Sequence, residues 1–198
     1  MRIALTGAIA SGKSAFSAFL NSQGVETLDA DDVVHELEAP GGECVDGIVG
    51  LFGVQVLSPD GGIDRRAVAK AVFGKDGSRA RAALERIVLP KVRKRILDWC
   101  DEVSSLPRVA VLPTLFESGW EGDFDFIACI VSPEELQVKR LVELRGYSAE
   151  DAVARIAAQL PAKEKSARSN ITIVNSSGLK ELEEEAVRFA RLVKEMTT

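Results

Sequence analysis

The chain has 198 residues, enough for one domain with inserted subdomains and a proper hydrophobic core. Hydrophobic residues make up 46% and charged residues 28% of it, as in ordinary globular proteins, and no apolar run approaches the length of a membrane span. The net charge of −5 argues against a non-specific grip on nucleic acid. We therefore expect a cytoplasmic protein, a monomer or weak homo-oligomer, that binds neither membranes nor nucleic acid.

The three cysteines, Cys44, Cys100 and Cys129, lie far apart and form no C-x-x-C pair. This spacing argues against a disulfide framework and against a zinc site. We expect reduced thiols that pack as small hydrophobic side chains.

A glycine-rich loop near the start of the chain carries the clearest chemistry. Residues 7–14 fit the pattern G-x-x-x-x-G-K-[ST] between a predicted strand, Ile3–Leu5, and a predicted helix, Ala15–Leu20. Backbone N–H groups of such a loop and the following helix N-terminus hold polyphosphate. Lys13 would reach the β- and γ-phosphates, and the Ser14 hydroxyl would ligate Mg²⁺. The sequence therefore predicts a nucleoside triphosphate site.

An acidic cluster, Asp29, Asp31 and Asp32, follows a second predicted strand, Val25–Leu28. In open α/β sheets ligands bind at the carboxyl ends of the strands. Capping of the next helix, predicted over Asp32–Leu37, explains one of the three carboxylates. Another is placed to accept or orient the proton of an attacking hydroxyl, and the pattern does not single out which.

His35, the only histidine, lies four residues after Asp31 and so on the same helical face. It is as easily an ordinary surface residue as a residue that contacts the substrate. Residues 33–104 are predicted to form a mostly helical lobe that receives the second substrate. Within it, Arg65 and Arg66 follow the predicted helix cap Asp64; they could meet an anion, or at least one could be a solvated helix charge. The helices expected in the lobe cover Val45–Phe52, residues 63–73 and residues 76–102.

Two further strands are predicted over Arg108–Leu112 and Phe126–Val131, and their apolar character fits a parallel sheet buried on both faces. The strand Arg108–Leu112 is followed by residues 113–117, Pro-Thr-Leu-Phe-Glu. It does not end in the Mg²⁺-binding Asp of a motor ATPase or GTPase. The chain also has no [NT]-K-x-D segment that would read guanine. Both absences favour a small-molecule kinase.

A cationic helical hairpin is predicted next. Its first helix begins with Ser132 as N-cap and Pro133 as the first helical residue; its second begins at Ser148 and runs through Leu160. Such a hairpin could be two solvated faces, but a lid that closes on ATP is favoured because phosphoryl transfer needs cations beyond the loop lysine. The cations are Lys139, Arg140, Arg145, Arg155, Lys163, Lys165 and Arg168.

The chain ends with a fifth predicted strand, Ile171–Val174, and an amphipathic helix over Leu179–Met196. The loop between them starts at Asn175 and is expected near the nucleotide base.

In this order the motifs resemble the dephospho-CoA kinase family over essentially the whole chain. The resemblance is carried by residues 5–14, Asp29-Ala30-Asp31 with His35, Asp64-Arg65, residues 113–117, Gln137 with Arg140 and Arg145, and residues 174–178. It implies an α/β fold of the P-loop NTPase type, a five-stranded parallel sheet with flanking helices, a helical CoA-binding lobe and a helical lid. It also implies transfer of the ATP γ-phosphate to the ribose 3′-hydroxyl of dephospho-CoA, with Mg²⁺.

The resemblance assigns roles to individual residues. Asp31 becomes the base, beside Lys13 and Arg140 as the other catalytic residues, and Ser14 the metal ligand. The implied boundaries are a core of residues 1–32, 105–135 and 169–198, a lobe of residues 33–104 and a lid of residues 136–168. The implied ATP contacts are Ala10, Ser11, Gly12, Lys13, Ser14, Ala15, Arg145 and Asn175, and the implied substrate contacts are Asp29, His35, Arg65, Leu115, Phe116 and Glu117.

Some positions depart from the family pattern. Ala8 and Ala10 stand where Gly is usual, which is tolerable if neither position needs a positive φ. The others are Leu89 in place of His, Thr114 in place of an apolar residue and Asn170 in place of Asp. Two other functions stay open: a nucleoside monophosphate kinase, against which the carboxylate cluster argues because it would repel a phosphate acceptor, and a catalytically idle ATP-binding module.

Overall fold

The computed structural model describes residues 1–72 and 77–197. The chain divides into two compact units, Met1–Asp29 with Cys100–Thr198, and Ala30–Trp99. The second unit begins and ends slightly earlier than the lobe predicted over residues 33–104. Within the described ranges no helix combines the length and the apolar character that crossing a membrane requires.

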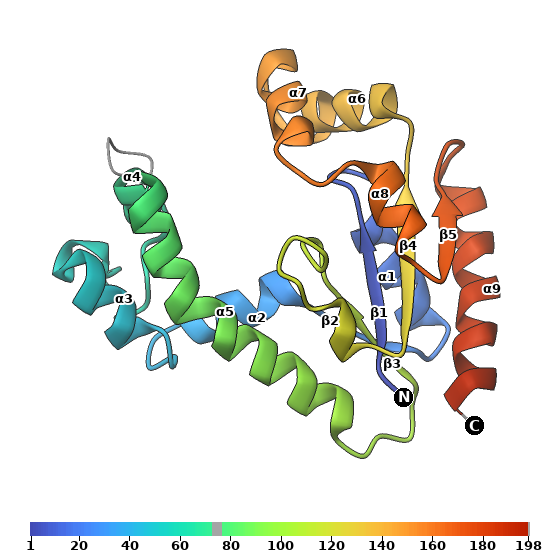
Figure 1. The fold of residues 1–198 in the computed structure, drawn as a ribbon, viewed down its shortest axis with the longest axis horizontal. Helices are drawn as coiled ribbons and strands as arrows, with labels where there is room; N and C mark the ends of the chain where they lie inside the picture. Colours follow the sequence, from blue (N-terminus) through green and yellow to red (C-terminus); the bar gives the residue numbers. More distant parts are fainter. Residues whose placement is uncertain (73–76, 198) are drawn as a thin grey trace. The chain divides into compact units, whose positions relative to one another are not determined.

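The first unit is built on a sheet of five parallel strands in the order β2-β3-β1-β4-β5 (Figure 1). The predicted five-stranded parallel sheet is therefore confirmed. All five residues of β1 are buried, as expected for a central strand covered on both faces. The strands are β1 (Ile3–Gly7), β2 (Glu26–Asp29), β3 (Arg108–Val111), β4 (Phe126–Val131) and β5 (Ile171–Val174).

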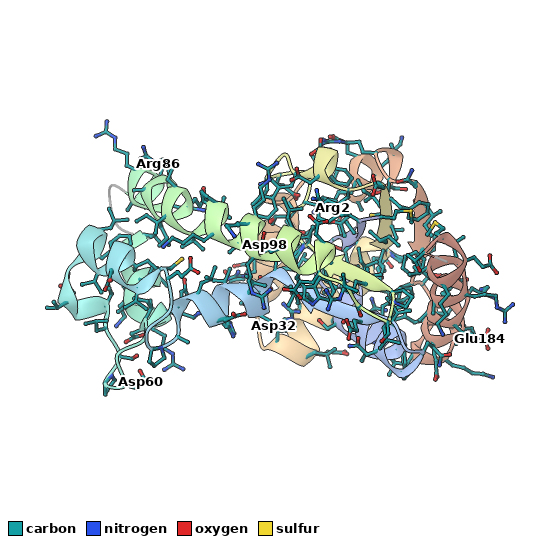
Figure 2. All side chains as sticks on the ribbon, turned by 90° about the horizontal axis from the view of Figure 1, so that it is seen from below. Arg2, Asp32, Asp60, Arg86, Asp98 and Glu184 are labelled. Atoms are coloured by element: carbon teal, nitrogen blue, oxygen red, sulfur yellow. The ribbon has the colours of Figure 1, made fainter. Side chains whose placement is uncertain are left out.

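Two helices, α1 (Lys13–Ser22) and α9 (Leu179–Thr197), pack against each other and share one core with the strands. Phe16 of α1 is fully buried, and its ring centroid lies 5.9 Å from that of Phe189. Full burial of a phenylalanine side chain such as that of Phe16 contributes about 1.5–3 kcal/mol to the free energy of folding. The opposite side of α9 is polar: Glu184 is exposed and projects outward (Figure 2).

Three helices, not two, connect β4 to β5: α6 (Glu134–Arg145), α7 (Ala149–Ala157) and α8 (Ala162–Ala167). The Ser148 hydroxyl accepts from the Asp151 N–H, so the predicted cap of α7 is confirmed. The predicted continuation through Leu160 is wrong, because α7 ends at Ala157. Leu160 directly precedes Pro161, and a residue before proline is disfavoured in helical geometry. The chain then forms α8, which packs against β4 and β1.

Ser132 does not cap α6, contrary to the prediction. The helix begins at Glu134, after Pro133, and has no side-chain cap. The Ser132 hydroxyl is buried and donates instead to the Asn175 carbonyl oxygen at 2.6 Å.

The second unit is helical, with α2 (Ala30–Glu38), α3 (Val45–Phe52), α4 (Arg65–Val72) and α5 (Gly77–Asp101). The Asp64 carboxylate accepts from the N–H groups of Arg66 and Ala67, so the predicted cap of α4 is confirmed. Helix α5 continues through Pro90 as predicted. Phe73 and Asp76, at predicted helix ends, lie outside the described residues. The 3-10 turns η1 (Val54–Val56) and η2 (Glu121–Asp123) were not predicted.

All three cysteines are free thiols. Cys44 and Cys129 are fully buried, as expected, and Cys100 is partly buried. Burial raises the pKa of Cys100 to about 11, so this thiol stays protonated, and therefore unreactive, at neutral pH.

Candidate active site

The carboxyl ends of the five strands meet at one edge of the sheet, because all strands are parallel. Along this edge Gly7 pairs with Ile130, Asp29 with Val111 and Val131 with Val174. Helices α6 and α7 lie at the same end of the sheet (Figure 1). Open α/β sheets bind their ligands at this edge, so the predicted phosphate loop is where the fold places a site.

Two glycines of the loop are required by its backbone. Gly7 has φ 150, and a Cβ there would lie 2.2 Å from the Ile130 carbonyl oxygen. Gly12 has φ 102, and a Cβ would lie 2.4 Å from the Asn175 side-chain nitrogen. At Gly7 the conformation and the approach to a backbone oxygen both require glycine; at Gly12 the conformation favours glycine, and a side chain would displace the Asn175 amide.

Lys13, in the first turn of α1, folds back over the loop. Its Nζ donates to the carbonyl oxygens of Gly7 at 2.9 Å and Ala8 at 2.8 Å. Burial and, next in size, the nearby Lys165 charge lower the pKa of Lys13 to about 8, although Asp29 opposes them. The ammonium is therefore held at the loop by weak acceptors that an anionic ligand can replace.

Two side chains, Arg140 of α6 and Asn175 directly after β5, donate hydrogen bonds to the Ala10 and Ser11 carbonyl oxygens of the loop. The Arg140 guanidinium donates to the Ala10 carbonyl oxygen at 3.0 Å and to the Ser132 hydroxyl at 2.9 Å. The Asn175 amide donates to the Ser11 carbonyl oxygen at 2.8 Å, and its Oδ1 accepts from Arg140 at 3.3 Å. Asn175, predicted as an ATP contact, is only 5% exposed and uses both side-chain polar atoms within the protein.

Ala10 has φ 54 and is the only residue other than glycine with a positive φ in the part of the chain described. The condition under which alanine would be tolerated here therefore fails at Ala10. A left-handed alanine costs about 1–2 kcal/mol because its Cβ crowds the following carbonyl oxygen. The loop stores this strain next to the residues that would hold phosphate.

We expect Ala10→Gly to raise the free energy of unfolding by about 0.5–1 kcal/mol, since glycine removes the strain but gains freedom in the unfolded chain. Urea unfolding measures this. Ala8→Gly is the matched control: Ala8 has no positive φ and is buried, so the same change should lower stability. Equal effects of the two changes would mean that the Ala10 backbone carries no strain.

The remaining predicted ATP contacts lie around the loop. Ser14 is exposed in the first turn of α1, and Ala15 packs against the core. Arg145 is exposed near the end of α6, and its charge helps to lower the pKa of Lys13, so it acts at the same edge. Among residues 1–72 and 77–197 no group of three or more His, Cys, Asp or Glu side chains could hold a metal ion.

The segment after β3 is packed inward. Leu115 is fully buried and Phe116 is 5% exposed, so substrate contact by either, as the resemblance implies, would need the segment to move. The Arg168 guanidinium lies over the Phe116 ring, 4.5 Å from its centroid. Glu117 forms an ion pair with Lys165 at 2.7 Å.

The second unit has a pocket of about 460 Å³ that brings together three residues predicted from the sequence, Asp31, His35 and Arg65. Asp31 and His35, which were expected on the same helical face, both line this pocket. Arg65 donates from Nε to the Glu38 carboxylate at 2.7 Å, which offsets its charge. The apolar lining is Val34, Val68, Ala69, Val72 and Leu84.

Comparison with known proteins matches this chain to one family. The dephospho-CoA kinase family model covers residues 1–181. The chain is 42% identical to the dephospho-CoA kinase of Symbiobacterium thermophilum over 180 residues, 89% of this chain and 74% of that protein. It is 35% identical to that of Anaeromyxobacter dehalogenans, over 94% of this chain and 89% of that protein.

Solved structures are similar to this chain over nearly its whole length. A Thermus thermophilus crystal structure has a TM-score of 0.80 at 32% identity, covering 98% of this chain and 97% of the other. Dephospho-CoA kinase from Campylobacter jejuni has a TM-score of 0.70 at 27% identity, covering 100% and 98%. Shikimate kinase from Acinetobacter baumannii, at 15% identity and a TM-score of 0.53, over 98% and 93%, shares the fold alone.

Proposed function

Because this chain belongs to the dephospho-CoA kinase family, we propose that it transfers the γ-phosphate of ATP to the ribose 3′-hydroxyl of dephospho-CoA, giving CoA and ADP. The observation that carries the proposal is the family match over residues 1–181, which spans the phosphate loop, the acidic cluster and all five strands.

On the donor side, ATP would take the place of the carbonyl oxygens that now hold Lys13. Loop N–H groups and the start of α1 would bind its phosphates. Mg²⁺ needs only one or two protein oxygens when phosphates and water complete its shell, so the exposed Ser14 hydroxyl fits it. When bound, the ion neutralises charge on the β- and γ-phosphates.

On the acceptor side, the pocket of the second unit suits a ligand that has both polar and apolar parts. Asp31, His35 and the ion pair of Glu38 with Arg65 supply the polar lining, and five aliphatic side chains supply the apolar one. As the 3′-hydroxyl oxygen attacks the γ-phosphorus, Asp31 would accept the hydroxyl proton while the bond to ADP breaks. Arg140 and Arg145 would stabilise the negative charge of the transferring phosphoryl group.

Lys13 predicts how activity depends on pH. Its pKa is lowered to about 8, so the free enzyme loses the ammonium charge as pH rises through that value. We expect kcat/KM for ATP to fall about tenfold per pH unit above it, since this ratio reports the free enzyme. Bound phosphates raise the pKa, so kcat should stay flat to higher pH. Lys13→Arg, which keeps its charge, should lose this decline; an unchanged decline would contradict the assignment.

The proposal is tested by mixing the protein with Mg²⁺-ATP and dephospho-CoA, AMP, CMP or pantetheine in parallel, and following ADP release and product mass. ADP together with CoA, formed only with dephospho-CoA, is the expected result. Transfer to AMP or CMP would indicate a nucleoside monophosphate kinase instead. ATP binding without transfer to any acceptor would indicate an idle ATP-binding module.

A further inference from the structure

Lys165, predicted as one of the lid cations, is the one charged side chain that is fully buried among the described residues. It lies in α8, the helix that packs against β4 and β1. An ammonium group taken out of water is costly unless it is paired and hydrogen-bonded. Its partners therefore indicate what the fold uses it for.

Both partners of Lys165 belong to the segment after β3. Its Nζ lies 2.7 Å from Glu117 Oε1 and donates to the Pro113 carbonyl oxygen at 2.9 Å. These two contacts join the first and last residues of the Pro113–Glu117 segment to α8. The Lys165 side chain is fully buried and the Glu117 side chain is 26% exposed, so solvent screens the ion pair from the Glu117 side only.

Glu117 carries the connection further. Its Oε1 also accepts from the Leu160 N–H at 3.1 Å. Leu160 lies between α7 and α8, where no helix supplies a backbone acceptor. The carboxylate therefore holds this connection in place.

The residue before Leu160 reaches the phosphate loop. Gln159 Oε1 accepts from the Ile9 N–H at 2.9 Å. The next residue is the strained Ala10, whose carbonyl oxygen is held by Arg140. Two hydrogen bonds therefore hold the loop beside the strained Ala10 backbone: Gln159 binds the Ile9 N–H, and Arg140 binds the Ala10 carbonyl oxygen.

We infer that Glu117, Gln159 and Lys165 form a clamp that positions the phosphate loop for the transfer proposed above. The ion pair of Glu117 and Lys165 fixes the connection between α7 and α8, and Gln159 in that connection fixes the Ile9 N–H. The three are positioning residues. Glu117, which the resemblance marks as a substrate contact, here acts through the protein.

The hydrogen bond of Gln159 is tested by amide hydrogen exchange of Ile9, followed by NMR without nucleotide. Gln159→Met should speed Ile9 exchange about tenfold, the scale of one lost hydrogen bond, whereas Gln159→Glu keeps an acceptor oxygen and should restore protection. In turnover, Gln159→Met should raise KM for ATP about five- to tenfold and leave KM for dephospho-CoA unchanged. Wild-type Ile9 exchange in Gln159→Met would overturn the clamp.

The anchoring by Lys165 has its own test. Lys165→Met should also speed Ile9 exchange, although Lys165 does not contact Ile9, while Lys163→Met, an exposed change on the same helix, should not. Because removing half of a buried pair can unfold a protein, Lys165→Met with Glu117→Leu serves as the second variant, and the same faster exchange is expected. Unchanged Ile9 exchange in either folded variant would refute the anchoring.

These outcomes are separable from the proposed function. The exchange measurements need neither ATP nor acceptor. Faster Ile9 exchange in the variants, in a protein that transfers no phosphate to dephospho-CoA, would retain the clamp and overturn the proposed function.

Discussion

Asp31→Asn is expected to lower kcat by about 10²–10⁴-fold, the usual contribution of a positioned general base, while the affinity for ATP stays as in the wild type. The amide keeps the size of the carboxylate but cannot take the hydroxyl proton. Steady-state kinetics with dephospho-CoA, together with calorimetric titration of ATP, measure the two effects separately.

Asp32 offers the matched control, as the neighbouring carboxylate on the same helix, exposed and outside the pocket lining. Asp32→Asn should change kcat by less than about twofold, as surface changes usually do. If Asp31→Asn weakens ATP binding as much as it slows turnover, its carboxylate serves the donor rather than the acceptor hydroxyl.

Lys13→Ala is expected to weaken ATP binding and to slow transfer as well, by about 10²–10³-fold in kcat, the effect of removing one preorganised donor to a developing charge. The loss has two parts because the ammonium contacts phosphate in the ground state and gains more charge to stabilise in the transition state. Single-turnover kinetics at saturating ATP isolate the second part.

A lysine-to-alanine change away from the loop controls for loss of net charge. Lys180 is exposed at the start of α9, and Lys180→Ala should leave both constants within about twofold. A loss of ATP affinity without loss of single-turnover rate in Lys13→Ala would limit this lysine to binding.

Local signals in the sequence were sufficient for most elements of the fold. The helix Val45–Phe52 and the strand Phe126–Val131 have the predicted bounds, since apolar spacing follows directly from burial. The caps at Asp64 and Ser148 are also as predicted, because an N-cap needs only residues within one turn.

The candidate site was foreseeable only in part. The loop pattern predicts Gly7, Gly12 and Lys13 from a short stretch, because the backbone conformation of the loop demands the two glycines and phosphate binding requires the lysine charge. Singling out Asp31 required the family resemblance. Gln159 carried no recognisable signal, since its contact with Ile9 joins residues 150 positions apart.

By itself, the sequence determined the parallel sheet, the phosphate loop and the order of the motifs, all of which depend on composition and spacing over a few residues. Tertiary structure alone decided the long-range polar pairings. Ser132 bonds to Asn175 rather than capping a helix, and Lys165 is buried against Glu117 rather than solvated. The physical reason is that burial of a polar side chain is costly unless a hydrogen-bonding or charged partner lies beside it, and the fold supplies that partner from a distant part of the sequence.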